Sequence, residues 1–420
     1  MKPFPTLVFL LFLASAQSIA APERANVRVI LWFDTEDYLL PADDDATKRL
    51  AQMLTDRGIR ATFKLVGEKA RVLARRGRRD VIAALKKHDI GYHANFHSVH
   101  PAPSEYLADC GLLDGMAEFA RREGGGAADV RRILGVKTLS CYGQPGSSWA
   151  SQTIAALKQI GVAPRGVPCY VDEGTHIGLD EQPFWYADAL VVYHMGQNYT
   201  RMDLHDPAAL EPAKEKFSAI AERLRHQGGG LISIFYHPCE WVHKEFWDGV
   251  NFRRGANPPR EQWKPPPQRP AVETEAAFER FAQYIDHIRS LPGIRFVTAS
   301  DLPDLYSDPV RTRGAGEPDL NQIAGRLDNG GGAEADFLVA LAIAYEYHRK
   351  NGKLPLEDGV TTGKNVELVP ARRVARDTPE LFGGWVIHKE GFRAPKILEV
   401  ARLQTWTLKP AIPKGELNSD

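Results

Sequence analysis

The sequence has no excess of charge of either sign. Its 420 residues contain 53 Lys and Arg side chains and 53 Asp and Glu side chains. A balance of this kind gives no overall field that would draw the chain to a nucleic acid or to an anionic membrane surface. We therefore expect no nucleic-acid partner, and any partner must be recognised by local groups.

Long apolar runs are missing beyond the N-terminus. The one such run, residues 7–14, follows Lys2 and is followed by small residues that end at Ala20. This layout is more typical of a secretory signal than of a membrane anchor. We expect residues 1–20 to be a signal peptide, the mature chain to have no stable membrane span, and the protein to be secreted or periplasmic.

Cysteine is scarce, with four in the whole chain. A disulfide-dense small scaffold is therefore excluded, and a chain of this length can bury a core without such links. In an exported protein the four cysteines could pair in three ways, and the sequence does not fix the pairing. Whether one disulfide forms is left open for Cys110, Cys141, Cys169 and Cys239.

No Gly-x-Gly-x-x-Gly motif follows the first apolar segment, so nothing indicates a dinucleotide site there. Instead, segments typical of strands alternate with segments of helical period. The polar candidate residues follow several different strands, as in an α/β barrel, whose loops gather at one face. We therefore predict a (β/α) barrel with strands at 27–32, 59–66, 90–93, 138–142, 189–193, 231–236 and 294–298, and helices at 45–57, 80–87, 151–160, 207–226 and 273–290.

The alternation stops near residue 306, which predicts a second region. Residues 307–332 are rich in Gly, Asp and Arg and have the composition of a linker. We predict that residues 21–306 form the barrel and that residues 333–420 form a small, mainly helical accessory domain. The proline-rich segment 251–270 lies within the barrel region, and a long irregular loop of this kind is expected to be a lid or a substrate-contacting rim.

Three histidines lie within eight residues, at positions 93, 97 and 100. His93 and His97 are four apart, so their imidazoles can converge on one ion. A carboxylate ligand is available where the first strand ends, at Asp34, Glu36 and Asp37. Side chains two apart on a strand share a face, so Asp34 and Glu36 are expected to point together. Two histidines and a carboxylate predict one divalent metal, of the zinc type.

These motifs resemble those of the polysaccharide deacetylases of carbohydrate esterase family four, whose fold is a deformed (β/α) barrel. Residues 34–37 look like the first motif of that family, which supplies a base and a metal ligand. Residues 90–97 resemble the second motif, with Ala94 where a hydroxyl residue is usual, and residues 234–238 resemble the fifth. The third motif normally contributes an arginine, and residues 141–146 have none.

The resemblance implies a role for each candidate residue. It implies Asp34 as catalytic base and His237 as catalytic acid. It implies Glu36 as metal ligand beside the two histidines, with Asp37 as the alternative carboxylate ligand. Contacts with substrate are expected from Tyr142, Gly143, Gln144 and Trp241.

The function expected from these residues is a secreted, metal-dependent hydrolase that removes acyl groups, N-acetyl groups foremost, from a polysaccharide or oligosaccharide. Two alternatives stay open. The missing arginine favours a catalytically weakened glycan-binding protein that keeps the barrel. A metal-dependent amidase acting on a small amide is compatible with the same catalytic residues.

Overall fold

The structure is a computed structural model, and it describes most of the region predicted to be the barrel. The described residues are 27–306 with gaps at 108–109, 111, 147–148, 173–182, 187–188 and 194–197, together with 386–388 and 391–393. The predicted signal peptide, linker and C-terminal helix lie outside the described residues. Among the described helices, none has the length and apolar character needed to cross a membrane.

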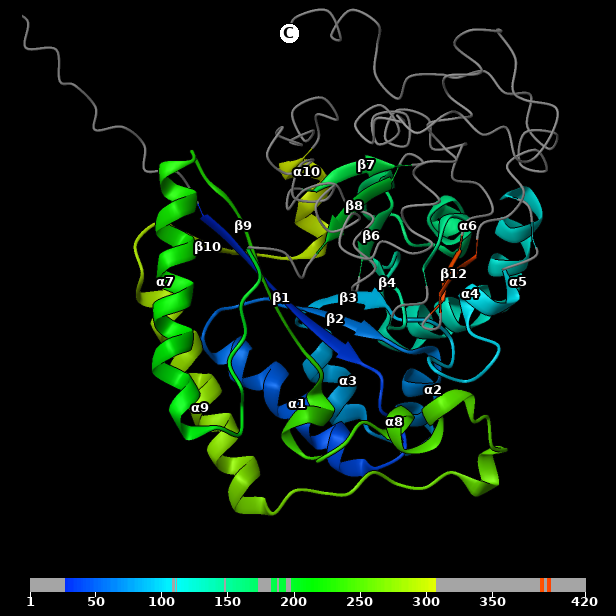
Figure 1. Ribbon diagram of the computed structural model, residues 1–420, viewed down its shortest axis with the longest axis horizontal. Coiled ribbons are helices and arrows are strands. Elements are labelled where there is room, and N and C mark those ends of the chain that lie inside the picture. Colours follow the sequence, from blue (N-terminus) through cyan, green and yellow to red (C-terminus); the bar gives the residue numbers. More distant parts are fainter. Residues whose placement is uncertain are drawn as a thin grey trace, which may run out of the picture.

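A curled, almost entirely parallel sheet forms the centre of the fold (Figure 1). Its first strand, β1 (Val27–Thr35), pairs in parallel with β2 (Thr62–Leu65), β9 (Gly230–Tyr236) and β10 (Ile294–Val297). Beyond β2 the sheet continues through β3 (Asp89–Tyr92), β4 (Tyr142–Gly143), β6 (Cys169–Asp172) and β8 (Ala189–Tyr193) to the antiparallel edge strand β7 (Phe184–Tyr186). This curled half-barrel, with helices around it, confirms the predicted deformed (β/α) barrel.

Strand β1 is buried on both faces, as expected for a parallel strand covered by helices on one side and by the inside of the curl on the other. Successive side chains point to opposite faces. Leu31 and Phe33 belong to the larger apolar cluster, whereas Ile30 and Trp32 belong to a second, separate cluster. Asp34 continues the series of Ile30 and Trp32, so the strand carries this carboxylate toward the second face.

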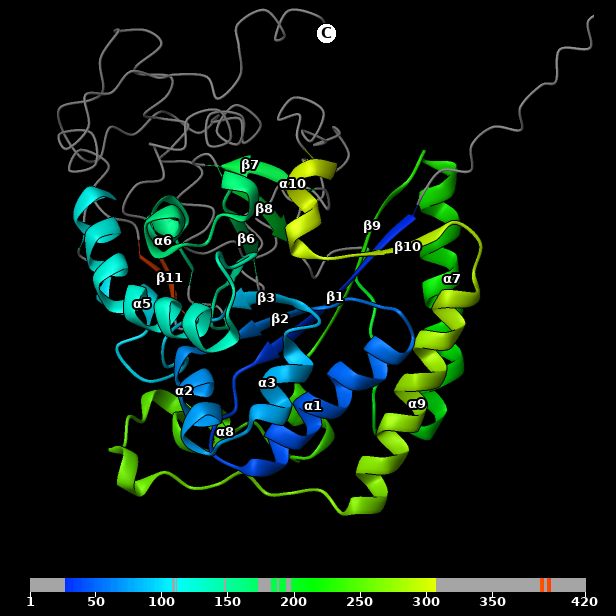
Figure 2. The same ribbon diagram turned by 180° about the vertical axis from the view of Figure 1, so that it is seen from behind.

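Helices cover the outer face of the sheet. Helices α1 (Pro41–Asp56), α2 (Gly67–Arg75) and α3 (Arg79–Leu85) lie behind β1, β2 and β3 in Figure 1 and in front of them in Figure 2. Helices α7 (Leu210–His226) and α9 (Ala271–Ser290) lie side by side next to β9 and β10. The predicted helices are present as α1, α3, α7 and α9, although α1 begins at Pro41 rather than near Asp45, whereas α2 was not predicted.

Some elements differ from the sequence prediction. Helix α5 (Leu112–Leu134) was not expected, because its three consecutive glycines at 124–126 are typical of a loop. The strand expected at 138–142 is reduced to the two residues of β4, and the helix expected at 151–160 divides into α6 (Ser151–Ala156) and a 3-10 turn (Leu157–Ile160). Cys141, Cys169 and Cys239 form no disulfide among the described residues.

The proline-rich segment 251–270 is packed against the barrel. The Trp263 ring lies 5.6 Å from the Trp247 ring and 6.2 Å from the Tyr38 ring, measured between centroids. Arg260 donates to Glu68 of α2 over 2.9 Å. The segment is therefore tied to the loop after β1 and to α2, so a freely hinged lid does not describe it.

The described residues of the C-terminal region form a short hairpin. Strands β11 (Val386–His388) and β12 (Gly391–Arg393) pair in antiparallel fashion, and β11 also pairs with β5 (Trp149–Ala150). The predicted helical character of residues 333–420 otherwise falls outside the described residues and stays a prediction.

Gly126 is the point where α5 closes on β3. A Cβ atom at this position would lie 2.5 Å from the Tyr92 hydroxyl and 2.5 Å from Asn95 Oδ1. Both partners are fixed, because Tyr92 donates to Glu123 and Asn95 accepts from Arg71. Only glycine allows this approach. Gly125, the neighbouring helix residue, has open space around its Cα.

We expect Gly126→Ala and Gly125→Ala to have opposite effects on the free energy of unfolding. Ala at 125 should stabilise the chain by about 0.5–1 kcal/mol, the usual gain over glycine inside a helix. Ala at 126 should destabilise it, because overpacking in a fixed environment costs about 1–3 kcal/mol. Urea unfolding of both variants measures the difference, and equal effects would contradict the close contact at Gly126.

Candidate functional site

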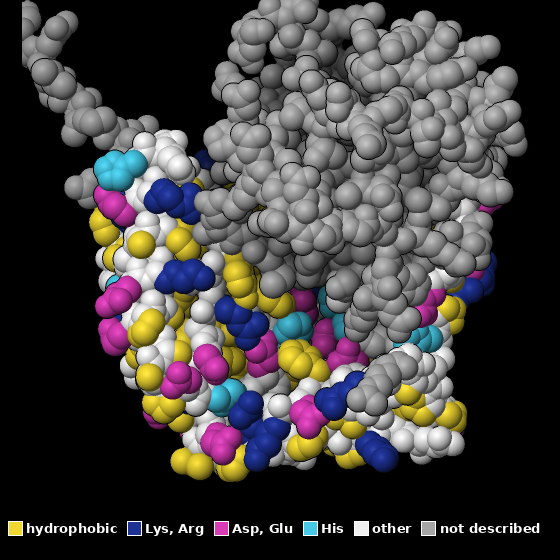
Figure 3. Space-filling view, in the orientation of Figure 1, with side chains coloured by type: hydrophobic (Ala, Val, Ile, Leu, Met, Phe, Trp, Pro, Cys, Tyr) yellow, Lys and Arg dark blue, Asp and Glu magenta, His cyan; other side chains and the backbone are white. Residues whose placement is uncertain are grey.

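Three predicted metal ligands meet in one place. Glu36 follows β1, and His93 and His97 follow β3, so the parallel pairing of β1, β2 and β3 brings them to the same sheet edge. Glu36 Oε2 lies 2.8 Å from His97 Nε2 and 3.3 Å from His93 Nε2. One ligand atom from each residue lies within 4.8 Å of the others, and all three side chains are buried. In Figure 3, histidine and acidic side chains gather near the middle of the described surface.

The N-terminus of α2 holds the histidine loop. Backbone N–H groups of Gly67 and Glu68 donate to the carbonyls of Ala94 and Asn95 over 3.0 and 2.9 Å. These donors are helix-terminal groups that have no partner within the helix. Ala94 has a φ of 65°, which turns the chain so that the two histidines flanking this turn face the same point.

His93 has its tautomer fixed by a partner that can only accept. Its Nδ1 lies 3.0 Å from the carbonyl oxygen of Gly143 in β4. A carbonyl has no proton to give, so Nδ1 must carry the hydrogen and Nε2 must carry the lone pair. That lone pair faces Glu36, as a metal ligand requires.

His97 is oriented through a two-step relay. Its Nδ1 lies 2.8 Å from Ser98 Oγ, and that hydroxyl donates to Asp248 Oδ2 over 2.9 Å. Because the hydroxyl hydrogen goes to Asp248, Ser98 accepts from His97 Nδ1, which leaves the Nε2 lone pair facing Glu36. Asp248 lies on α8 (Trp247–Asn251), far along the chain, and the Trp247 ring packs 6.3 Å from the His97 ring.

Asp34 has a cationic partner that the sequence analysis did not identify. Lys64 of β2 lies directly opposite Asp34 in the parallel register, and its Nζ is 2.6 Å from Asp34 Oδ1. Both side chains are buried. Burial alone raises the pKa of Asp34, but the charges of Lys64, His93 and His237 outweigh it and bring that pKa to about 2. Asp34 is therefore ionised at neutral pH.

The signal for Lys64 was present in the sequence. All four residues of β2 are buried, and one of them is a lysine. A fully buried lysine is rare unless it is paired, so a lysine in a strand of this kind indicates a carboxylate on a neighbouring strand.

His237 faces the same carboxylates from the end of β9. Its Nε2 lies 3.7 Å from Asp34 Oδ2 and 3.9 Å from Glu36 Oε2, while its Nδ1 contacts Glu240 Oε1 over 2.9 Å. Arg201 pairs with the other oxygen of Glu240. Burial lowers the pKa of His237, but Glu36, Glu240 and Asp34 outweigh burial and raise it to about 9. His237 therefore carries a proton at neutral pH.

The electrostatics of the three ligands follow from their mutual contacts. Burial raises the pKa of Glu36, yet His97 and His237 overcome this effect and hold it well below its usual range. Burial lowers the pKa of His93. Burial is also the largest single effect on His97, but the charge of Glu36, the hydrogen bond to Glu36 and the charge of Asp248 together outweigh it and raise the pKa of His97. The carboxylate is thus ionised and available as a ligand.

Asp37, the alternative ligand, lies outside this cluster. Its Oδ2 is 2.9 Å from His243 Nδ1, and its Oδ1 accepts from the Leu39 backbone N–H over 2.9 Å. Lys69 donates to the Asp37 carbonyl over 2.7 Å. The structure thus brings Glu36, and not Asp37, next to the histidines, because the strand delivers alternate side chains to the site.

Trp241, which was expected to contact substrate, lies in the core. Its ring is fully buried and packs against Phe33, Tyr236, Phe278 and Phe281, with centroid distances from 5.2 to 6.5 Å. The 3-10 turn Pro238–Trp241 after β9 carries this side chain inward, into the core between β1 and α9. Trp241 therefore stabilises the fold and cannot stack on a ligand.

Direct side-chain contact with substrate is also contradicted for Tyr142 and Gln144. The Tyr142 ring is buried in the core, 5.6 Å from the Phe119 ring, and the Gln144 carboxamide is buried between the Tyr170 hydroxyl and the Gly146 carbonyl. Gly143 does adjoin the site, through the carbonyl that holds His93.

The donor set fits a divalent transition metal. Two imidazole nitrogens and one carboxylate oxygen are the ligands of many open zinc sites, and three protein ligands leave positions for water and substrate. Each histidine has its outer nitrogen tied to a defined partner, as is usual for metal-binding histidines.

We expect Ser98→Ala to weaken metal binding by about 10–100-fold, because loss of an outer hydrogen-bonding partner of a ligand typically has this effect. Competition with a chelator measures the affinity, and Ser98→Thr should restore it. Ser218→Ala is the matched control, since Ser218 makes a similar contact of 3.1 Å to His287 far from the site. Unchanged metal affinity in Ser98→Ala would show that the relay does not hold His97 as a ligand.

Comparisons with known proteins yield distant structural likenesses alone. No family model and no curated protein matches the sequence. Among solved structures, a protein named as a polysaccharide deacetylase from Mycobacterium smegmatis is 14% identical, with 69% of this chain and 93% of that chain covered and a TM-score of 0.42. An allantoinase has 12% identity, the same two coverages and a TM-score of 0.43. A family 4 acetyl xylan esterase from Clostridium thermocellum, in complex with a cobalt ion, has 16% identity, coverages of 68% and 96%, and a TM-score of 0.35. Likenesses this distant assign no activity to the chain.

Proposed function

We propose that this protein is a metal-dependent hydrolase that removes acyl groups, N-acetyl groups foremost, from a saccharide. One observation carries the proposal. An ionised carboxylate, Asp34, and a protonated imidazole, His237, both face the cluster of three ligand side chains, and both lie within 4.0 Å of a ligand atom. A base and an acid next to a carbonyl-polarising ion are the groups that acyl transfer to water requires.

A divalent ion held by Glu36, His93 and His97 would polarise the acyl carbonyl and lower the pKa of a water molecule. Asp34 is placed to accept the proton of the attacking water. Lys64 keeps Asp34 ionised and fixes one of its oxygens, which leaves Oδ2 on the side of the histidines. The base is therefore held in one orientation before substrate arrives.

His237 is placed to protonate the leaving nitrogen or oxygen. Glu240 contacts its Nδ1, so the proton to be transferred is on Nε2, the atom that faces Asp34 and Glu36. Arg201 anchors Glu240 in turn. The pair thus acts as acid and orienter, which is the arrangement that an amine leaving group needs.

The saccharide substrate is supported by the motifs that the sequence shares with polysaccharide deacetylases. The apolar segment at residues 7–14 supports action outside the cytoplasm, on a polymer of the cell envelope or the surroundings. The weakened, glycan-binding alternative drew its support from the missing arginine, and the Lys64–Asp34 pair removes much of that support.

We expect Asp34→Asn to retain metal and to lose turnover by about 10²–10⁴-fold, the usual effect of removing a general base. His93→Ala combined with His97→Ala should lose both. Elemental analysis and acetate release from chitin fragments, peptidoglycan and acetylated xylan, with and without a chelator, measure the two properties.

Three results would count against the assignment. Equal metal content in the wild type and in the double histidine variant would reject the metal site. Loss of metal in Asp34→Asn would make Asp34 a ligand. Metal and glycan binding without acetate release would favour the glycan-binding alternative.

The role of His237 predicts a dependence on the leaving group. An amine must be protonated as it departs, whereas 4-nitrophenolate leaves readily without a proton. We expect His237→Gln to lose about 10²-fold or more on N-acetylated oligosaccharides, within the range for a lost general acid, and far less on 4-nitrophenyl acetate. Rates of acetate release and of nitrophenolate release measure this ratio. Equal losses on both substrates would indicate that His237 serves the site in another way.

A further inference from the structure

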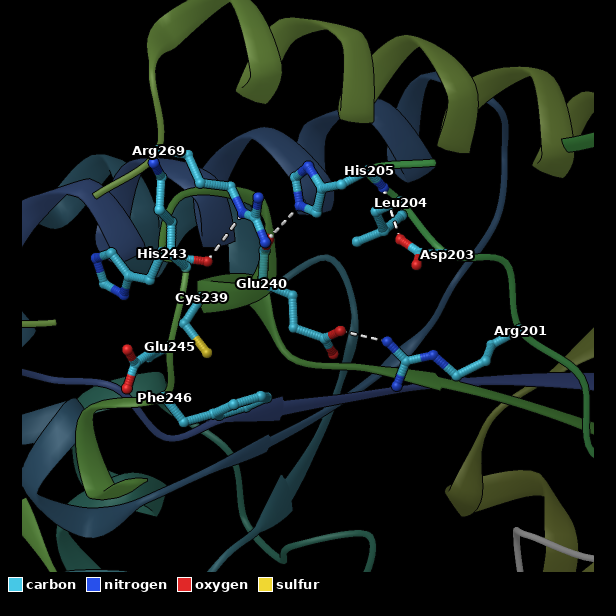
Figure 4. Close-up of a pocket in the computed structure, with 11 residues that line it drawn as sticks. Arg201, Asp203, Leu204, His205, Cys239, Glu240, His243, Glu245, Phe246 and Arg269 are labelled. Carbon is cyan, nitrogen blue, oxygen red and sulfur yellow. Dashed lines mark hydrogen bonds and ion pairs between the residues drawn. The ribbon is translucent and has the colours of Figure 1, made fainter. Parts of the chain in front are cut away.

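A pocket of about 370 Å³ adjoins the proposed acid (Figure 4). Glu240, which orients His237, lies on its wall, and so does Phe246, whose ring packs 4.7 Å from the His237 ring in an edge-on arrangement. Pockets of this size hold small ligands or parts of larger ones. A substrate group bound in this pocket would therefore lie next to the leaving group, which His237 is proposed to protonate.

The acidic side chains of the pocket are mostly engaged. Glu240 contacts both His237 and Arg201, and Glu245 pairs with Arg253 over 2.9 Å. Asp203 accepts from the His205 backbone N–H, and Figure 4 shows it on the opposite side of the pocket from Arg269. Little negative charge is therefore left at the Arg269 side.

The basic side chains at that side are less compensated. Lys244 has no ion pair among the described residues, and its side chain is exposed. Arg269 uses its Nε to donate to the His243 carbonyl over 3.0 Å and makes a longer contact of 3.4 Å with Glu273, whose side chain is 45% exposed. An excess of positive charge remains at Lys244 and at the outer part of the Arg269 guanidinium.

Backbone pairing holds these two cations close together. His243 and Gln268 form an antiparallel bridge, flanked by hydrogen bonds from Lys244 N to the Pro267 carbonyl and from Arg269 N to the Val242 carbonyl. Lys244 and Arg269 are diagonal neighbours across this bridge, a relation in which the Cα atoms typically lie about 7–8 Å apart. Two long cationic side chains that start from positions this close can both reach one anion, which would reduce the repulsion between them.

We propose that this pocket is a subsite for an anionic group of the substrate, a carboxylate or a phosphate carried by a sugar unit next to the acylated one. The substrate is then an acidic glycan. The inference rests on the proposed function, whose reacting groups lie beside the pocket. A guanidinium fork matches either oxyanion in a bidentate contact, and the lysine adds a second donor and charge.

Equilibrium binding tests the subsite without requiring turnover. Isothermal titration calorimetry of the full chain compares three acetylated oligosaccharides of equal length, one neutral, one with carboxylates on alternate units and one with phosphates. We expect one anionic glycan to bind at least about tenfold more tightly than the neutral one at low salt, and the preference to shrink as salt rises. The more tightly bound glycan identifies the anion.

Substitutions at Lys244 and Arg269 test whether the preference for anionic glycans arises in this pocket. Lys244→Gln combined with Arg269→Gln should reduce the affinity for the anionic glycan to that for the neutral one, and the exposed Lys244→Gln alone should remove part of the preference. Lys216→Gln combined with Arg289→Gln, on helices α7 and α9, is the matched control and should leave the preference unchanged.

Equal affinity for the neutral and anionic glycans, no binding of either, or a preference that survives the double variant would overturn the subsite. Acetate release in the same samples separates this result from the proposed function. Release from neutral and anionic glycans alike, unaffected by the double variant, overturns the subsite and leaves the hydrolase in place. A preference that the double variant abolishes, without any acetate release, supports the subsite and rejects the hydrolase.

Discussion

The buried ion pair between Asp34 and Lys64 is the interaction on which the site depends. Two charges taken out of water are costly, and removing one partner of such a pair typically destabilises a protein by about 3–5 kcal/mol. The pair is therefore better explained by the orientation it gives to Asp34 than by stability. Lys64 holds one carboxylate oxygen, and the other faces His93 and His237.

The register of the sheet places the two members of this pair opposite each other. Asp34 and Lys64 are direct neighbours in the parallel register of β1 and β2, and the same register places the histidines after β3 beside Glu36. One pairing pattern thus delivers the base, its cation and three ligand side chains to a single sheet edge. A one-residue shift of β1 would turn its acidic side chains into the helical layer.

Much of the fold could be predicted because its signals are local. Apolar runs and helical periods placed most strands and helices, and Glu36, His93 and His97 were found because spacing and strand parity are local properties as well. Trp241 shows the limit of such reasoning. Its position beside His237 in the sequence suggested a place in the site, but a 3-10 turn separates them, and which way a turn directs a ring depends on distant packing. Helix α5 was missed for a similar reason, because its glycines fit a contact with β3 that local propensity does not contain.

The residues that orient the site were only partly open to local prediction. Ser98 follows His97 directly, and Glu240 lies three residues after His237, so both are close in the sequence to the histidine that they hold. The Gly143 carbonyl of β4 that holds His93 and Asp248 of α8, which holds Ser98, come from distant parts of the chain, with no spacing that the sequence could reveal. In each case the outer ring nitrogen of the histidine is bound, and the inner ring nitrogen is directed at the carboxylates of Asp34 and Glu36.

Because the partners of the outer nitrogens are fixed, the imidazoles need no rearrangement when an ion or substrate arrives. Preorganised groups of this kind act on a developing charge without first having to reorient, which is where such sites gain most of their catalytic effect.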